Sequence, residues 1–458
     1  MPTATSAKRI GADLVNGPLL KSLILFAIPI VLSSIIQQLY TMVDLIVIEK
    51  YMGAVGTSGV SVGGELSDFI SPIAVVLASA VQVYIGQLVG AGQMEKTRRA
   101  AGTAISMFLL FAVAVMLVGI LLCRPILSLL NCPQEAFSQA AAYMVISAFG
   151  LPFVFGYHVI SGILRGMGES KRPLFFILIA AAVNVLLDIL LVAVFHLEAA
   201  GTAIATVMSE IACCIAAFLC MYRNRKAIGF SFSPRFFAID RECAVVLLQQ
   251  GVPRALHSIL VRFSMVWVNA QVNAYGLVFS STNGIGNKLL KFLEVYSSGF
   301  HQASSAVVAQ NLGAQKPERA SKSAYYSLGI CASLAAVVSL VVLLSPESIF
   351  GIFASEAPVL ETGCFYLRIM IIHLFLTAWV NAFQSVIAGC GDARMNFAIG
   401  LIDGIVCRVG LCLLFAKVMN MGAYGYFWGT ALTRLLPAFL VTVYFVRGSW
   451  KTRSLVRK

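Results

Sequence analysis

One carboxylate, Asp44, stands inside an apolar stretch of the chain, in the segment QLYTMVDLIVI at residues 38–48. An ionisable side chain within such a stretch is costly, so it is a functional hypothesis by default. If the segment is helical, Ser33, Gln37, Tyr40 and Thr41 lie on the same face as Asp44. A polar stripe of this kind must face the protein interior or water, so we expect it to line an internal site.

Two further segments repeat this pattern of polar residues on one helical face. Asn184 and Asp188 are four residues apart, and Thr202, Thr206 and Glu210 follow the same spacing. Carboxylates that meet in a low-dielectric pocket cannot all stay ionised, so such a cluster can bind a proton reversibly near neutral pH. Alternatively, its oxygens can hold Na⁺, or these groups can serve only to hydrogen-bond helices together.

A second set of polar and aromatic residues is a candidate lining for a substrate cavity. These residues are Gln37, Ser161, Glu210, Tyr157 and Trp379. The alternative for any single aromatic residue among them is packing in the core.

The elements that must position these residues are membrane-spanning helices. The chain has 458 residues, of which 59% are hydrophobic and 12% charged, with a mean hydropathy of +0.88. A soluble domain is about a quarter charged, and about 20 apolar residues cross a bilayer as a helix. We therefore predict an all-α polytopic membrane protein. Its twelve expected spans are residues 20–50, 57–88, 101–123, 137–164, 173–195, 200–222, 250–275, 282–309, 323–345, 358–388, 395–418 and 423–446.

The net charge of +13 follows the predicted topology. With the N-terminus in the cytoplasm, the loops on that side carry 23 Lys and Arg, against 3 on the outer side. This excess places both termini inside by the positive-inside rule. We therefore expect a multi-pass protein of the cytoplasmic (inner) membrane that contacts the lipid bilayer and binds no nucleic acid.

The sequence repeats itself at a shift of 223 residues. QLVGAGQMEK at 87–96 then falls on QNLGAQKPER at 310–319, and RGMGESK at 165–171 falls on AGCGDAR at 388–394. The repeat predicts an N-lobe (1–222), a cytoplasmic linker (223–241) and a C-lobe (242–458), with six spans in each lobe. Two parallel repeats around a cavity are the plan of several secondary transporters. The alternative is a duplicated bundle without a passage.

No arrangement of residues predicts an enzyme. The five histidines are scattered, and no nucleophile-elbow motif or cluster of Cys and His is present. GAGQMEK lacks the spacing of a phosphate-binding loop and reads as a structural turn. We expect no cofactor, no metal other than a possible Na⁺ at Asp44 and Asp188, and a monomer. A channel is the remaining alternative.

Several motifs together resemble the MATE (multidrug and toxic compound extrusion) transporters. They are Pro29, QQLYTMVD (37–44), YIGQLVGAG (84–92), GILRGMGESKRP (162–173), NVLLDILLV (184–192) and GTAIAT (201–206). The resemblance covers nearly the whole chain. It implies two six-helix lobes that rock between inward-facing and outward-facing states, and export of organic, mostly cationic and amphipathic, compounds in exchange for H⁺ or Na⁺.

The same resemblance assigns roles to individual residues. Asp44 and Asp188 look like the coupling acids of the N-lobe, and Tyr40, Asn184 and Thr206 look like their hydrogen-bonding partners. Pro29 resembles the proline at which some members bend the first helix.

The sequence also departs from the family pattern. Some members carry further coupling acids in the C-lobe, where this chain has Val261 and Thr377, so a C-lobe ion site is not expected. Ser161 stands where members often have Asn, and Glu49 stands where many have Gly.

The repeat also suggests an outer gate. At the shift of 223, Glu65 falls on Lys288 and Asp68 falls on Lys291, so acids of one lobe face bases of the other by pseudo-symmetry. The competing partner of Lys291 is Glu294. The C-lobe spans also carry Arg262, Arg408 and Arg434. This basic character supports an alternative function, a flippase for a lipid-linked or anionic substrate.

Overall fold

The computed structural model describes residues 11–230, 232–354 and 356–456, and within these ranges all regular structure is helical. In chain order the α-helices are α1 (Leu19–Gly90), α2 (Met94–Leu121), α3 (Cys123–Leu129), α4 (Gln134–Gly166), α5 (Lys171–Asp188), α6 (Glu198–Arg223), α7 (Arg225–Ile228), α8 (Arg241–Asn273), α9 (Leu277–Leu293), α10 (Val295–Gly313), α11 (Pro317–Leu344), α12 (Pro346–Gly351), α13 (Ala357–Cys390), α14 (Ala393–Leu401), α15 (Gly410–Leu413), α16 (Ala423–Leu432) and α17 (Leu435–Arg447). Three π-helical segments are η1 (Ile189–Val194), η3 (Ile402–Val409) and η4 (Leu414–Val418), and the two 3₁₀ turns are η2 (Pro234–Phe237) and η5 (Ser449–Thr452).

The prediction of an all-α polytopic membrane protein is confirmed. In the described part of the chain, 11 helical stretches are long and apolar enough to cross a membrane. The predicted eighth span, 282–309, corresponds to α9 and α10, which are separated at Glu294. The piece α9 has only 17 residues, and α10, with 19, carries many polar side chains, so neither is among these 11 stretches.

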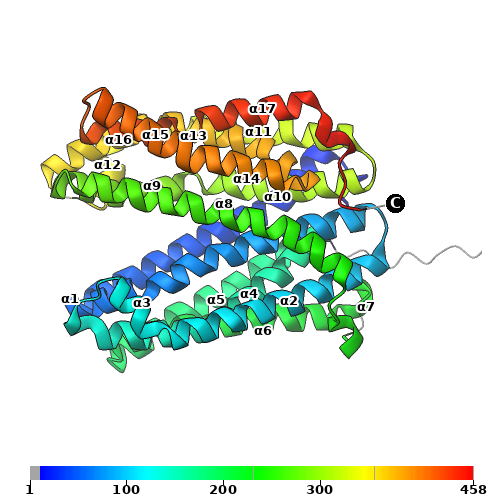
Figure 1. Ribbon diagram of the computed structural model, residues 1–458, viewed down its shortest axis with the longest axis horizontal. Coiled ribbons are helices and arrows are strands. Elements are labelled where there is room, and N and C mark those ends of the chain that lie inside the picture. Colours follow the sequence, from blue (N-terminus) through cyan, green and yellow to red (C-terminus); the bar gives the residue numbers. More distant parts are fainter. Residues whose placement is uncertain (1–10, 231, 355, 457–458) are drawn as a thin grey trace, which may run out of the picture. The chain divides into compact units, whose positions relative to one another are not determined.

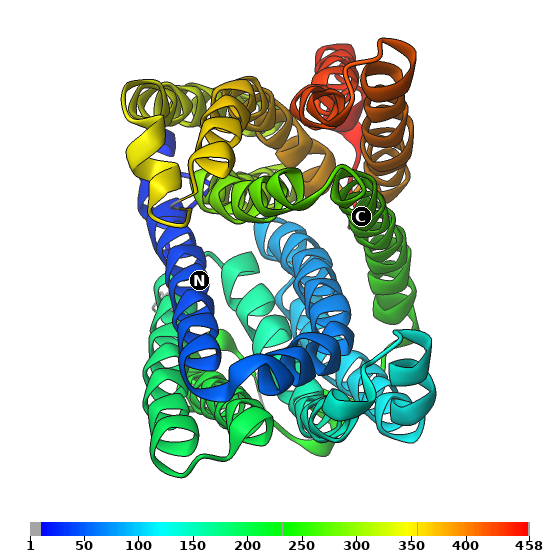
Figure 2. The same ribbon diagram turned by 90° about the vertical axis from the view of Figure 1, so that its left-hand side faces the viewer.

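The first two expected spans are joined in one helix, α1, of 72 residues, and two stretches of it, Leu19–Asp44 and Val55–Gly90, are each long and apolar enough to cross a membrane. At a rise of about 1.5 Å per residue this helix would be about 108 Å long if straight, several times the thickness of a bilayer core. Figure 2 shows its dark-blue ribbon turning at a corner. Pro29 and Pro72 lie inside α1, and the Ser33 hydroxyl donates to the Pro29 carbonyl at 2.8 Å. Bending at Pro29 during transport stays a prediction.

The chain divides into two units. The first holds Ile28–Leu248 with the chain start up to Asp13, and the second holds Leu14–Ala27 with Gln249–Lys458. In the first unit α4 packs on α2, α5 and α6 (Figure 1). In the second unit α13 packs on α9, α10, α11 and α16. The lobe boundaries drawn from the sequence repeat stay a prediction.

The repeat extends to the backbone hydrogen bonds of the turns. The Gln93 N–H donates to the Leu88 carbonyl at 3.0 Å, and 223 residues later the Lys316 N–H donates to Asn311 at 2.8 Å. The turn at GAGQMEK reaches a positive φ of 72° at Gly92, which glycine adopts without steric cost. This segment is therefore a structural turn that links two helices in each half.

Irregular helix geometry is repeated as well. The π-helical segment η1 follows α5, and η4 lies at the corresponding place of the second half. The Phe195 N–H donates to Leu190 at 3.0 Å, and the Met419 N–H donates to Leu414 at 2.9 Å. π-Helical turns are rare and are found mostly at functional sites. In the first half this segment begins directly after Asp188.

Candidate functional site

Two buried acids meet in the first unit. Asp44 lies on α1, and Asp188 is the last residue of α5 and has no exposed surface. Their carboxyl groups interact electrostatically with each other. Neither Asp188 oxygen has a hydrogen-bond partner among the described residues. Because two carboxylates cannot donate to each other, a shared proton or a bound cation is the natural link between them.

Asn184 contributes a side-chain amide on the same helical face as Asp188. It lies one turn before Asp188 on α5, is 1% exposed, and neither its Oδ1 nor its Nδ2 has a hydrogen-bond partner in the described part of the chain. Carboxylate and amide oxygens are hard donors, which suits H⁺ or Na⁺ better than a soft transition metal. The predicted pair and its predicted neighbour are therefore placed together.

Tyr40 and Glu210 extend the cluster. Tyr40 lies one turn before Asp44 on α1 and interacts electrostatically with Asp44, Glu210 and Tyr157. Glu210 projects from α6 over Gly150 of α4, where an added Cβ would lie 2.2 Å from its Oε2. Glycine at this position lets the carboxyl group pass between the two helices. Four helices, α1, α4, α5 and α6, thus contribute to one polar cluster.

The other residues predicted in the first unit lie around this cluster. Tyr157 on α4 is 5% exposed, and its ring lies 4.8 Å from that of His158. Ser161 is fully buried one turn further along α4. Thr206 lies half-buried on α6, and Gln37 lies half-buried on α1. Among the described residues, no hydrogen bond joins the Thr206 hydroxyl to an acid, so its partner role stays a prediction.

Two neighbours of the cluster were missed in the sequence. Tyr143 on α4 interacts with the charges of Asp44, Asp68 and Glu210. Arg165, which the sequence analysis places in a cytoplasmic loop, is only 8% exposed and interacts electrostatically with Tyr157. The helical spacing of Tyr143 and Tyr157 along α4 was the available signal. The side chain of Glu49 lies outside the described residues.

The residues of the predicted outer gate are divided between the two units. Glu65 and Asp68 are exposed on α1 of the first unit, and Lys288 and Lys291 are exposed on α9 of the second. Their pairing stays a prediction. The competing Lys291–Glu294 ion pair is not among the ion pairs of the described residues.

Glu294 instead approaches a histidine. One of its carboxylate oxygens lies 3.7 Å from His373 Nε2. Trp379, also in the second unit, lies on α13, is 42% exposed and donates its indole N–H to Thr442 at 2.8 Å. It belongs to a different unit from the acid cluster.

The second unit encloses a cavity of about 200 Å³ with both signs of charge. His257, Asp403 and Arg434 contribute the titratable part of its lining. Asp403 is 4% exposed, and its Oδ1 has no hydrogen-bond partner among the described residues. Asp403 and the buried Arg408 both lie on η3 and interact electrostatically. Val261, at a position where some members of the family carry an acid, lies in the apolar part of the lining.

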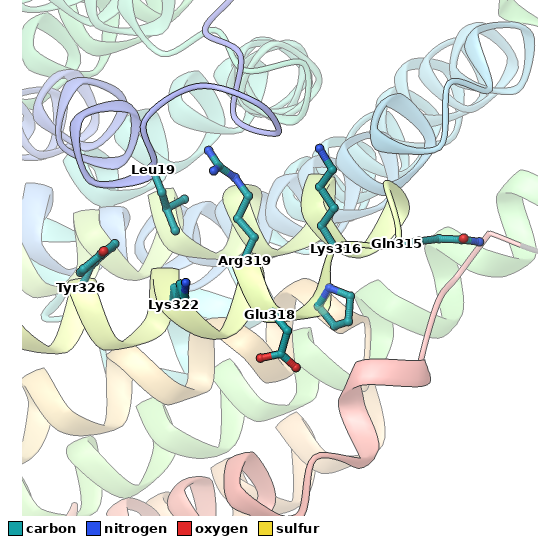
Figure 3. A pocket seen from close by; sticks show the side chains of 8 residues that line it. Leu19, Gln315, Lys316, Glu318, Arg319, Lys322 and Tyr326 are labelled. Atoms are coloured by element: carbon teal, nitrogen blue, oxygen red, sulfur yellow. The ribbon is translucent and has the colours of Figure 1, made fainter.

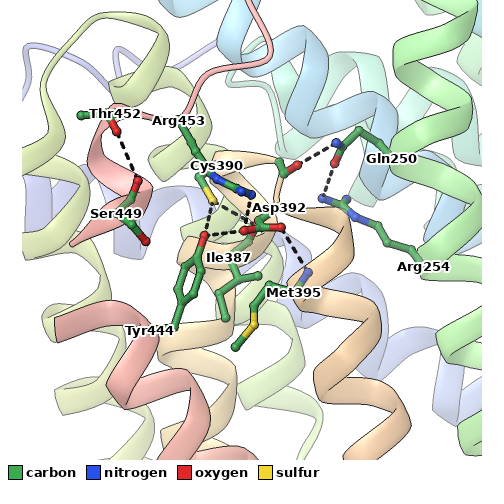
Figure 4. Close-up of polar contacts among 11 residues, drawn as sticks. Gln250, Arg254, Ile387, Cys390, Asp392, Met395, Tyr444, Ser449, Thr452 and Arg453 are labelled. Atoms are coloured by element: carbon green, nitrogen blue, oxygen red, sulfur yellow. Dashed lines mark hydrogen bonds and ion pairs between the residues drawn. The ribbon is translucent and has the colours of Figure 1, made fainter. Parts of the chain in front are cut away.

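A separate polar network in the second unit is structural. Asp392 Oδ1 accepts from the Met395 N–H at 3.1 Å and caps α14, and its Oδ2 accepts from the Tyr444 hydroxyl at 2.8 Å. Arg453 of the C-terminal segment forms an ion pair with the same carboxylate (Figure 4). These contacts fix the loop that follows α13.

An all-helical fold with apolar spans and repeated halves defines a polytopic membrane protein. The family model MatE matches residues 29–190 and 253–414, once in each half. The chain belongs to this family of membrane transporters, as the resemblance in the sequence implied.

The chain is similar over nearly its full length to proteins named as multidrug transporters. It is 23% identical over 442 residues to the probable multidrug resistance protein YoeA of Bacillus subtilis (strain 168), covering 95% of both chains. It is 22% identical over 433 residues to the multidrug export protein MepA of Staphylococcus saprophyticus, covering 93% of this chain and 94% of that one.

Solved structures share the fold. One is an outward-facing multidrug resistance MATE family transporter of the MOP superfamily, with a TM-score of 0.90, 19% identity and coverage of 96% of this chain and 97% of that one. Another is a MOP superfamily transporter from Pyrococcus furiosus, described by a reverse polarity of its binding pocket, with a TM-score of 0.90 and 18% identity over 99% of this chain and 100% of that one.

Proposed function

We propose that this protein is a secondary antiporter that exports organic, cationic and amphipathic compounds in exchange for H⁺ or Na⁺. The contact between the buried carboxyl groups of Asp44 and Asp188 carries this proposal. The names of the relatives, a multidrug resistance protein and a multidrug export protein, support the substrate class.

The mechanism follows from competition for one set of oxygens. A proton or Na⁺ at Asp44 and Asp188 removes the net negative charge that attracts an organic cation. An ion drives a change of state only by binding one state more tightly than the other. Loading the ion from the outer side therefore favours release of the substrate there, and losing the ion to the cytoplasm prepares the site for the next substrate molecule.

In this proposal the protein works as a monomer in the cytoplasmic membrane, with both termini in the cytoplasm. The 23 Lys and Arg in the loops of one side, against 3 in the loops of the other, support this orientation. Tyr40, Asn184 and Thr206 are the proposed partners of the two acids. Gln37, Ser161, Glu210, Tyr157 and Trp379 are the proposed contacts of the substrate.

Transport in proteoliposomes tests the proposal. A fluorescent organic cation is followed under an imposed pH gradient and, separately, under an imposed Na⁺ gradient. We expect one of the two gradients to drive transport in the wild-type protein, and Asp44→Asn to abolish the driven component, because an amide carries no negative charge for the ion to neutralise.

One matched control keeps the carboxyl group at position 44, and the other removes a buried acid elsewhere. Asp44→Glu retains a carboxyl group at the site and is expected to retain part of the driven transport. Asp403→Asn removes a buried acid of the second unit and is expected to leave the ion coupling in place. Transport by Asp44→Asn at the wild-type rate, under the gradient that drives the wild-type protein, would refute the proposed coupling.

A second candidate function is flipping or export of a lipid-linked or anionic compound. The cavity lined by His257 and Arg434, together with the buried Arg408, favours it. The test uses the same vesicles with a fluorescent anion in place of the cation. Transport of the anion that is lost in Arg434→Gln and kept in Asp44→Asn would favour this second function.

A further inference from the structure

A basic pocket of about 540 Å³ lies at the start of α11 in the second unit. Lys316, Arg319 and Lys322 contribute its positive charge. In Figure 3 the side chains of Lys316 and Arg319 point to one side of α11, whereas Glu318 points to the other. Glu318 is already paired with Lys451 at 2.8 Å. Within the described residues, no carboxylate forms an ion pair with any of the three cations in the pocket.

The contacts that these cations do make are with neutral oxygens. The Lys316 ammonium donates to the Asn16 side-chain oxygen at 2.7 Å. One guanidinium nitrogen of Arg319 donates to the Gly17 carbonyl, and its Nε has no hydrogen-bond partner in the described part of the chain. These neutral acceptors orient Lys316 and Arg319 without neutralising their charge, whereas Lys322 interacts electrostatically with Glu318.

The sequence repeat supplies an internal comparison. A pocket of about 520 Å³ occupies the corresponding place in the first unit, at the start of α2. At the shift of 223, Lys96 corresponds to Arg319, and Arg99 corresponds to Lys322. In the first unit both cations face carboxylates: Lys96 lies 2.6 Å from Glu242, and Arg99 lies 3.9 Å from Asp240.

Two carboxylates of the first pocket, those of Asp240 and Glu242, have no counterpart in the second, where Glu318 is the one lining carboxylate and is paired with Lys451. By the same shift Glu242 corresponds to Leu19, and Asp240 corresponds to Gly17. Leu19 lines the basic pocket as Glu242 lines the other. The second pocket thus keeps the two cations of the first but has no equivalent of the carboxylates that pair with them there.

The surroundings indicate where an external anion comes from. The pocket lies where two apolar spans begin, at Leu19 and at Pro317. Tyr326, which also lines it, is 39% exposed. Basic pockets where spans begin, at the level of the lipid head groups, bind anionic lipids.

We propose that the pocket formed by Lys316, Arg319 and Lys322 binds the phosphate group of an anionic phospholipid. Arg319 and Lys322 contact the phosphate oxygens in place of the carboxylates that Lys96 and Arg99 hold in the first unit. The acyl chains extend along the apolar surface beside Leu19.

Native mass spectrometry of the full chain, titrated with phosphatidylglycerol, tests the proposal. We expect Lys322→Gln and Arg319→Gln each to weaken binding of one phosphatidylglycerol roughly fivefold, the effect of one surface cation. Binding of phosphatidylcholine is expected to be unchanged. Arg99→Gln, the repeat-equivalent of Lys322→Gln, is the matched control and is expected to have no effect.

Two further variants exchange one residue between the two pockets. Leu19→Glu supplies the missing carboxylate and is expected to remove the site. Glu242→Leu removes a carboxylate from the first pocket and is expected to create a second site. Because Glu242 has an exposed side chain (61%), this variant folds even if Leu19→Glu does not.

Three results would overturn the proposal. One is an equal weakening of phosphatidylglycerol binding by Lys322→Gln and by Arg99→Gln, which would indicate a general charge effect. The second is an equal affinity of the wild-type protein and of Arg319→Gln for phosphatidylglycerol. The third is binding of inorganic phosphate or glycerol 3-phosphate as tight as that of the lipid, which would assign the pocket to a soluble anion.

Discussion

The neighbour of the buried Asp188 carboxyl group is another acid, Asp44. A basic side chain in its place would stabilise the negative charge of Asp188. An arginine partner would hold Asp188 ionised at every physiological pH and would make it inert. The carboxyl group of Asp44 instead leaves the pair dependent on a proton or a cation. The choice of an acid as the neighbour is therefore what makes this place suitable for exchange rather than for structure.

Asp240, outside the membrane spans, shows the contrasting case of a structural acid. Its Oδ1 accepts from the Cys243 N–H at 3.0 Å, at the start of α8. This hydrogen bond, together with the charge of Arg99, lowers the pKa of Asp240. A lowered folded-state pKa gives a stabilisation that is present above the ordinary value near 4 and is lost as the pH falls through the folded-state pKa.

We predict that Asp240→Ala lowers the free energy of unfolding by about 1 kcal/mol at neutral pH, the usual effect of losing a helix cap. Asp240→Asn keeps the cap and is expected to lose only the pH-dependent part. Thermal unfolding in detergent between pH 7 and pH 3 measures both. Identical pH profiles for the wild-type protein and Asp240→Asn would rule out this carboxylate as a contributor.

At the scale of elements, close helix packing in the second unit depends on a glycine. A Cβ added at Gly429 on α16 would lie 2.6 Å from the Cys412 backbone of α15. We predict that Gly429→Ala lowers the free energy of unfolding by about 1–3 kcal/mol, as overpacking does. Gly410→Ala is the matched control, because nothing lies within 4 Å of an added Cβ there. Equal unfolding temperatures for the two variants would contradict this packing account.

The elements also show how far sequence reasoning reached. The spans were predictable because apolar composition and length are sufficient for a membrane helix. The contact of Asp44 with Asp188 followed from polar faces on separate helices. The interruption at Glu294 and the π-helical segment after Asp188 were not predictable, because both depend on tertiary packing within otherwise continuous apolar stretches.

At the scale of the whole molecule, the two halves exchange the starts of their first helices. Leu14–Ala27 belongs to the second unit, and residues 241–248, which begin the second half, belong to the first. The repeat, which aligns Gly17 with Asp240, was the signal for this exchange. A lobe defined as one continuous range of residues cannot include such an exchange.

One buried amide holds the exchanged N-terminal segment. The Asn311 side chain is fully buried and donates to the Leu14 carbonyl at 3.0 Å and to Val307 at 2.8 Å. We predict that Asn311→Ala increases hydrogen exchange at residues 14–18 about fivefold, since a buried hydrogen bond contributes about 1 kcal/mol. Ser333→Ala, an exposed position on α11, is the control. Unchanged exchange in Asn311→Ala would show that other contacts hold the segment.

The account rests on ion exchange at the acid pair, and displacement of the bound ion measures it most directly. An organic cation is added to the purified protein in weakly buffered solution, and the released H⁺ is counted by a pH indicator and the released Na⁺ by a radioactive tracer. We predict that binding releases one of the two ions from the wild-type protein, and that Asp44→Asn and Asp188→Asn release neither. Release from both variants in the wild-type amount would contradict the assignment of coupling to Asp44 and Asp188.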